Sequence, residues 1–219
     1  MASLLVWAAA FLVLHLGISG TPLRRPLAGR LGERGFRGAF SGVAVVLLLQ
    51  LCLTYAAAPT RWLWHTPDGV RFVLAALMLP AFVLVVLSLW PKPAALRGPD
   101  APASGIHRIT RHPMMVGISL WALVHLVGRG ELGALVFFGT FLVNAGVGMR
   151  LMDHKLHLRD PGHWADLIAT TSILPFAAVL GRRNDLRLGE IAWPGVGLGA
   201  ALWVGFLATH GLLFGVRPL

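Results

Sequence analysis

Two histidines lie inside long apolar segments of this chain. His15 lies in LLVWAAAFLVLHLGIS and His125 lies in MMVGISLWALVHLVG. An imidazole deep in a bilayer is costly, and it is normally retained only where it pairs with another group or has a function. Imidazole is a usual haem ligand, so two such rings facing each other would supply both axial ligands of one haem. For each histidine alone, the alternative is a hydrogen-bonded packing residue.

A second set of candidates lies in the segment GIHRITRHPMMVG, residues 105–117. Pro113 suits the first turn of a helix, where its missing N–H costs little. Arg108, Arg111 and His112 would then lie beside the free backbone N–H groups of a helix start, which attract carboxylates or phosphates. The sequence predicts Arg111 and His112 as catalytic residues and Arg108 as a cofactor-binding residue. The alternative is a basic anchor for the inner leaflet.

A third set is the histidine-rich stretch RLMDHKLHLRDPGHWADL, with His154, His157 and His163 close to Asp153. The spacing permits metal binding, but the stretch contains no cysteine and no third fixed ligand. A solvated helix face is the preferred interpretation, and the sequence does not define a role for these histidines.

The composition places these residues in a membrane protein. Mean hydropathy is +0.72 and 56% of the residues are hydrophobic, more than a soluble domain of 219 residues can bury. We predict an all-α fold, a single membrane domain over residues 1–219. Glycines at 139, 146 and 148, and at 195, 197 and 199, predict close packing of the fifth and sixth helices. The six predicted membrane-spanning helices cover residues 4–19, 38–58, 69–90, 113–128, 131–152 and 191–216.

Basic residues fall mainly on one side of these helices. Of the 19 Lys and Arg residues, 14 lie in the connections after the first, third and fifth helices, and Arg150 lies near the end of the fifth helix on the same side. This asymmetry predicts that both termini face outward and that these connections are cytoplasmic. The net charge of +10 therefore reflects topology and not a nucleic-acid partner. Trp164, Leu167, Ile168 and Ile173 recur at roughly helical spacing in the last of these connections and predict an amphipathic helix on the inner membrane face.

The same topology predicts similar membrane depths for the two histidines. The first helix runs inward and the fourth runs outward, so each histidine lies about 18 Å from the point where its helix enters the bilayer. In a hydrocarbon core of roughly 30 Å both fall near the middle, within about 6 Å of each other along the bilayer normal. We therefore predict His15 and His125 as metal ligands, with haem as the metal centre.

Residues 105–117, together with LWALVH, GMRLMDHKL and SILPFAA, resemble the NnrU family, small bacterial inner-membrane proteins linked to nitrite and nitric oxide respiration. Plant zeta-carotene isomerases are similar to this family. The resemblance implies a multi-pass protein of the bacterial inner membrane that acts in denitrification or isomerises a polyene lipid. It also implies that His15 and His125 hold haem b. The isomerases have a cysteine three residues before the second histidine, where this chain has Ala122, so ligand exchange through that thiol is excluded.

Two further functions compete with this interpretation. The RHP motif and the stretch that follows it are also similar to isoprenylcysteine-type membrane methyltransferases, which bind S-adenosylmethionine. Met115 stands where those enzymes usually have Tyr, and Met152 and Asp153 stand where they have paired glutamates, which counts against methyl transfer. The other alternative is a non-catalytic assembly factor for a respiratory complex. The expected partners are the lipid bilayer and either a hydrophobic small-molecule substrate or a respiratory enzyme.

Overall fold

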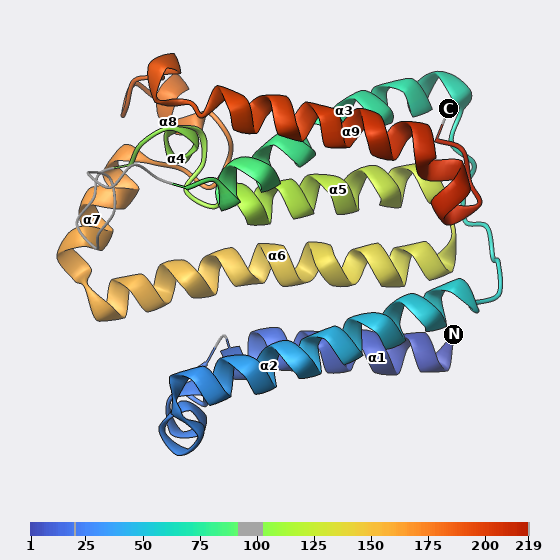
Figure 1. Cartoon of the computed structure of the whole chain (residues 1–219), viewed down its shortest axis with the longest axis horizontal. Coiled ribbons are helices and arrows are strands. Elements are labelled where there is room, and N and C mark those ends of the chain that lie inside the picture. Colours follow the sequence, from blue (N-terminus) through green and yellow to red (C-terminus); the bar gives the residue numbers. More distant parts are fainter. Residues whose placement is uncertain (20, 92–102, 219) are drawn as a thin grey trace. The chain divides into compact units, whose positions relative to one another are not determined.

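The computed structural model describes residues 1–19, 21–91 and 103–218, and the chain is all-helical apart from turns and short connections (Figure 1). Residues 92–102, in the connection after the third predicted span, lie outside this description. The elements are α1 (Ala2–Leu12), the π-helix η1 (Val13–Ser19), α2 (Arg24–Ala56), α3 (Asp68–Leu89), α4 (Ile106–Ile109), α5 (Pro113–Arg129), α6 (Leu132–Arg159), α7 (Pro161–Thr170), α8 (Ala177–Leu180), the 3-10 helix η3 (Leu188–Glu190) and α9 (Trp193–Phe214).

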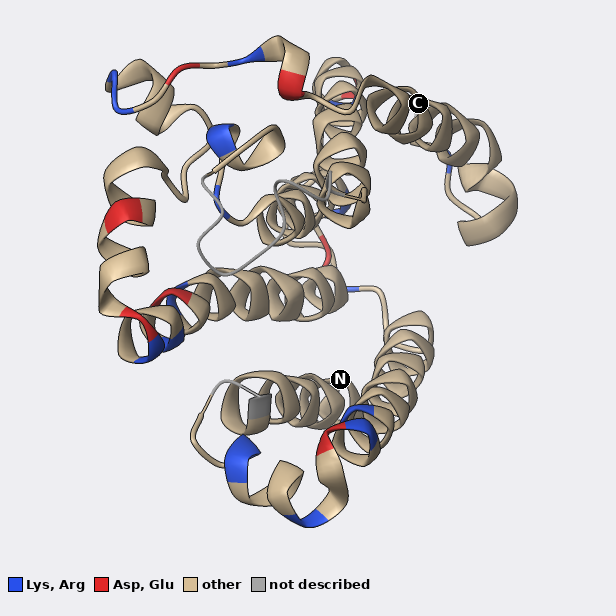
Figure 2. Cartoon of the chain, turned by 60° about the vertical axis from the view of Figure 1, so that its left-hand side comes forward, with Lys and Arg blue, Asp and Glu red and all other residues tan. Residues whose placement is uncertain are grey.

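All six apolar segments that the sequence predicts are helical. Helices α2, α3, α6 and α9 are long and apolar enough to cross a membrane, whereas Ala2–Ile18 and α5 are apolar but shorter. Lys, Arg, Asp and Glu gather at helix ends, in the connections and in the first part of α2 as far as Arg37, and the middles of α3, α6 and α9 carry none of them (Figure 2). These features are those of a multi-pass membrane protein. The outward orientation of both termini stays a prediction.

The ends of two helices differ from the sequence prediction. Helix α2 begins at Arg24 and is interrupted at Gly32, whose φ of 71° is left-handed. The turns before this break fold back, so that Arg24 lies 2.7 Å from Glu33 and its guanidinium lies over the Phe36 ring. Helix α6 continues past the predicted end at Met152 as far as Arg159, because good helix formers follow and the first proline comes only at Pro161.

The chain divides into two compact units. The first comprises Met1–Thr66 and His125–Met152, and in it α1 lies along α2 (Figure 1). The second comprises Pro67–Val124 and the chain from Asp153 onward, and in it α3 and α9 lie side by side. The amphipathic helix predicted in the connection after the fifth span is α7, which contains Trp164, Leu167 and Ile168. Ile173 is not part of it, because the helix ends at Thr170 and Thr171 is extended.

Helix α9 approaches α3 closely at two glycines. A Cβ atom added to Gly199 would lie 2.9 Å from the Cα of Val83, and one added to Gly195 would lie 2.8 Å from Cδ2 of Leu87. Gly197, between them on α9, has no heavy atom within 4 Å of the same position among the described residues. The absence of a side chain at 195 and 199 therefore lets the two helix backbones approach.

Gly199→Ala should destabilise the second unit because the new methyl group meets the backbone of α3, which cannot move without shifting the helix. Overpacking of this kind typically costs about 1–3 kcal/mol. Gly197→Ala is the matched control on the same helix, and it should be neutral or stabilising because alanine favours helix more than glycine does. Thermal unfolding in detergent measures both variants. Equal melting temperatures for the two would contradict the close contact.

Candidate functional site

The imidazole of His15 is held by the helix that carries it. His15 lies in the π-helix η1, and π-helical turns are rare and frequently occur at functional sites. Its Nδ1 lies 2.9 Å from the carbonyl oxygen of Phe11. A carbonyl only accepts, so Nδ1–H donates and the neutral ring carries its lone pair on Nε2. Metal-ligating histidines are commonly held in the same way, by a hydrogen bond from the nitrogen that does not bind the metal.

An aromatic cluster surrounds the two histidines in the first unit. His15 stacks on Phe11 at 4.1 Å between ring centroids, and His125 stacks on Phe138 at 4.7 Å. Further ring contacts link these two pairs. The ring centroids of Phe11 and Phe141 are 5.4 Å apart. The Phe137 centroid lies 5.0 Å from that of Phe138 and 5.2 Å from that of Phe141. The aromatic cluster is Phe11, Tyr55, Phe137, Phe138 and Phe141, with Tyr55 stacked on Phe137 at 4.6 Å.

The two predicted ligands therefore belong to one cluster. Phe138 and Phe141 are three residues apart on α6, about 4.5 Å along the helix axis. The donor set fits a haem: an imidazole at His15 whose Nδ1 bonds to a carbonyl and leaves Nε2 for a metal, a second imidazole at His125, and aromatic rings that suit a flat conjugated ligand. Ligation of iron by the pair stays a prediction.

Arg111 and His112 form a second group of contacts, which we call the inner corner, with Asp153 and Trp164. Arg111 donates to the Asp153 carboxylate from Nε at 3.0 Å and from Nη2 at 2.7 Å. His112 Nε2 lies 2.7 Å from the other carboxylate oxygen of Asp153. The three side chains are only 9–12% exposed, and the Arg111 guanidinium lies 5.5 Å from the Trp164 ring.

The backbone before α5 positions the inner corner. Thr110 is fully buried, and its hydroxyl donates to the carbonyl of Ile173 at 2.7 Å. Next to it the N–H of Arg111 donates to the carbonyl of Ser172 at 3.0 Å. These bonds hold residues 109–111 against residues 172–176, with Thr110 in extended conformation, and α5 then begins at Pro113 as the sequence predicts.

The electrostatics of the inner corner make His112 a neutral side chain. Burial lowers the pKa of His112 below its ordinary value, although Asp153 partly opposes this effect. The ring then donates from Nε2 to Asp153 and keeps a lone pair on Nδ1, which is able to accept a proton. The charge of Arg111 is balanced by Asp153, so an anion from outside the chain must compete with this carboxylate. Binding of such an anion stays a prediction.

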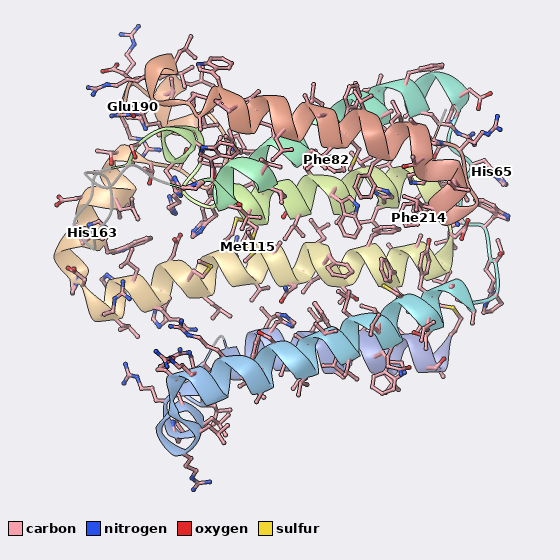
Figure 3. All side chains as sticks on the ribbon, in the orientation of Figure 1. His65, Phe82, Met115, His163, Glu190 and Phe214 are labelled. Carbon is pink, nitrogen blue, oxygen red and sulfur yellow. The ribbon has the colours of Figure 1, made fainter. Side chains whose placement is uncertain are left out.

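Arg108 makes a separate ion pair with Glu190, at the end of η3 (Figure 3). The pair is bidentate, with Arg108 Nε 2.7 Å and Nη2 3.1 Å from the two carboxylate oxygens, and the N–H of Gly105 donates to the same group at 3.0 Å. Hydrogen bonds from Arg108 and Gly105 lower the pKa of Glu190 to about 2. The contact ties α4 to the segment that precedes α9, and the predicted role of Arg108 in cofactor binding stays untested.

Glu190→Gln should destabilise the protein at neutral pH, and the difference from wild type should shrink in acid. The folded pKa of Glu190 lies below the ordinary value of 4.5, so its contribution is complete above about pH 4.5 and is lost as the pH falls toward about 2. Thermal unfolding at pH 7 and at pH 3 measures this difference. Asp68→Asn is the control, because Asp68 is 91% exposed and lies 3.6 Å from Arg71. An undiminished difference at pH 3 would contradict the assignment.

The histidines of α6 and α7 do not form a metal site with their neighbours. His163 lies on α7 (Figure 3), and its backbone N–H donates to the N-cap residue Asp160. His157 meets the Trp164 ring edge-on at 6.3 Å. In the described part of the chain, no three His, Cys, Asp or Glu side chains lie close enough together to hold a metal ion.

The fold and the candidate site define a small all-helical, multi-pass membrane protein with two histidines in one aromatic cluster. The chain matches the NnrU family, described as NnrU protein, over residues 3–218, and it belongs to this family. It is 28% identical over 194 residues to the chloroplastic 15-cis-zeta-carotene isomerase of Arabidopsis thaliana and 28% identical over 193 residues to that of Zea mays. Each match covers 84% of this chain and 52% of the relative, so the chain spans about half the length of these relatives. No solved structure matches it significantly.

Proposed function

We propose that this protein is a haem-binding membrane isomerase that changes the configuration of a double bond in a polyene lipid. The observation that carries the proposal is the similarity to 15-cis-zeta-carotene isomerases over 84% of the chain. The contacts of His15 and His125 with one aromatic cluster support it. The proposed location is the bacterial inner membrane, with the bilayer supplying the substrate.

The residues of the first unit would hold b-type haem through His15 and His125. When bound, haem would supply a redox-active iron able to exchange charge with a conjugated substrate. The aromatic cluster suits such a substrate, because its rings stack on flat apolar surfaces. Ala122 is fully buried in the place where the isomerases have a cysteine, so this position would offer the iron no thiol ligand.

The inner corner would act as a positioning element in this proposal. Arg111 and His112 immediately precede α5, the helix that carries His125. Their bonds to Asp153 hold the first turn of that helix in place. His112 could also accept a proton through Nδ1, because its pKa is lowered and the ring is neutral at physiological pH.

Absorption spectra of the purified protein, oxidised and reduced, test the proposal. A Soret band is expected after expression with ample haem, together with conversion of a cis polyene on chromatographic assay. A colourless protein that binds labelled S-adenosylmethionine would overturn it in favour of a methyltransferase. A colourless protein that binds neither would favour an assembly factor. A haem protein that binds nitric oxide and leaves the polyene unchanged would favour the role in denitrification.

A further inference from the structure

Arg129, the last residue of α5, has a buried donor without an acceptor. The Arg129 side chain is 31% exposed as a whole, and its Nη2 lies 3.0 Å from Glu131, whose side chain is 11% exposed. Its Nε is buried and has no hydrogen-bond partner among the described residues. A buried N–H without an acceptor costs free energy, because it has lost its hydrogen bonds to water and has formed none in the protein. Such unsatisfied donors are rare in native structures and often mark the place of a bound group. A bound anionic group would supply the missing acceptor.

A fixed loop covers the end of α5 beside Arg129. The indole of Trp64 donates to the carbonyl of Val127 at 3.0 Å, and the backbone N–H groups of Leu63 and Trp64 both donate to the carbonyl of Gly130. Gly130 has a φ of 60°, and the carbonyl oxygen of Trp64 occupies the space of a Cβ there. The backbone around Arg129 is therefore held in one conformation, which favours a preformed binding site.

The position of Arg129 relates it to the aromatic cluster. His125 and Arg129 are four residues apart on α5, and side chains at this spacing lie on the same face of a helix. The Tyr55 hydroxyl, at the edge of the cluster, is within hydrogen-bonding reach of Arg129. A ligand bound at His125 thus has a guanidinium one helical turn farther along α5.

We propose that Arg129 binds a carboxylate of the haem that His125 holds, an inference that rests on the proposed function. Haem carries two propionate carboxylates, and an arginine N–H to a carboxylate is a strong, charge-assisted hydrogen bond. Glu131 holds one Nη of Arg129 and leaves Nε for the ligand. The carboxylates then lie toward the end of α5, and the porphyrin ring lies toward the aromatic cluster.

Titration of the haem-free protein with haem and with haem dimethyl ester tests the proposal. The ester has the same iron and ring but no carboxylate. Wild type should bind haem at least about tenfold more tightly than the ester, the size expected for a hydrogen bond between charged groups. In Arg129→Gln the preference should disappear, while the ester affinity stays at the wild-type value. Arg71→Gln, which removes a half-exposed arginine of the second unit, should keep the full preference.

A second variant controls for loss of stability, because Arg129→Gln leaves the buried carboxylate of Glu131 without its cation and destabilises the protein. The doubly substituted protein R129Q/E131Q removes both charges and should also show no preference for haem. Equal affinities of wild type for haem and ester, or a preference retained by both variants, would overturn the role of Arg129 and leave haem binding intact. Failure of wild type to bind either compound would overturn both this inference and the proposed function.

Discussion

Replacing either His15 or His125 with alanine should convert a low-spin haem spectrum into that of a high-spin or haem-poor protein. Two imidazoles on one iron give a low-spin centre held from two helices, so each substitution removes one axial bond. The two single variants should look alike, and the doubly substituted protein should lose haem altogether. Absorption and electron paramagnetic resonance spectra of the purified variants measure the change.

His65→Ala and His210→Ala are the matched controls, since both residues lie outside the aromatic cluster. His65 packs against Trp62 at 4.8 Å, and Nδ1 of His210 lies 2.6 Å from the carbonyl of Val216. Their spectra should be those of wild type. If both single variants at His15 and His125 keep the wild-type spectrum, the two histidines are packing residues and do not bind haem. The inner corner is then the remaining candidate for the functional site.

The helices are predictable from the sequence, because a long apolar segment in a membrane must satisfy its backbone hydrogen bonds internally and a helix does so. Their ends were less predictable, since these depend on local breaks. The apolar pattern does not reveal the break in α2 at Gly32 or the continuation of α6 to Arg159. The π-helical turn around His15 was also missed, because its sequence resembles that of an ordinary apolar helix.

The candidate site was predicted only as far as its local motifs. Residues 105–117 identified Arg108, Arg111 and His112, but the carboxylates that bind them are distant in sequence. Asp153 is 42 residues from Arg111, and Glu190 is 82 residues from Arg108. Such pairs form by tertiary contact and leave no periodic pattern in the sequence. The sequence therefore does not show that the two arginines already have carboxylate partners within the chain.

The close helix packing predicted at the glycines of α6 and α9 also follows only partly from the sequence. The prediction of close contact is confirmed at Gly195 and Gly199, but it is wrong at Gly197, which lies on another face of α9. It is not confirmed for the glycines of α6 at 139, 146 and 148, where an added Cβ would meet no heavy atom within 4 Å among the described residues. A glycine marks a place where backbones are able to approach, and the partner helix decides where they do.

Asp153→Ala should be the most destabilising single substitution at the inner corner. It removes the acceptor of Arg111 and His112 together and leaves a nearly buried guanidinium without a counter-charge. Breaking a buried ion pair from one side typically costs about 3–5 kcal/mol. Denaturant or thermal unfolding in detergent measures the loss. Asp166→Ala, at an exposed position on α7, is the control and should change the free energy of unfolding by less than about 0.5 kcal/mol.

The double substitution R111M/D153M separates the charge effect from the packing effect. Both charges are then absent, so no buried ion lacks a partner, and most of the stability lost in Asp153→Ala should return. Because the two methionine side chains fill the space of the ion pair, α5 and His125 should remain in place, and the haem spectrum of this double variant should stay close to wild type. A wild-type melting temperature for Asp153→Ala would contradict the buried ion pair. A stable R111M/D153M protein that binds haem and isomerises no polyene would instead assign Arg111, with His112 beside it, a direct part in the reaction.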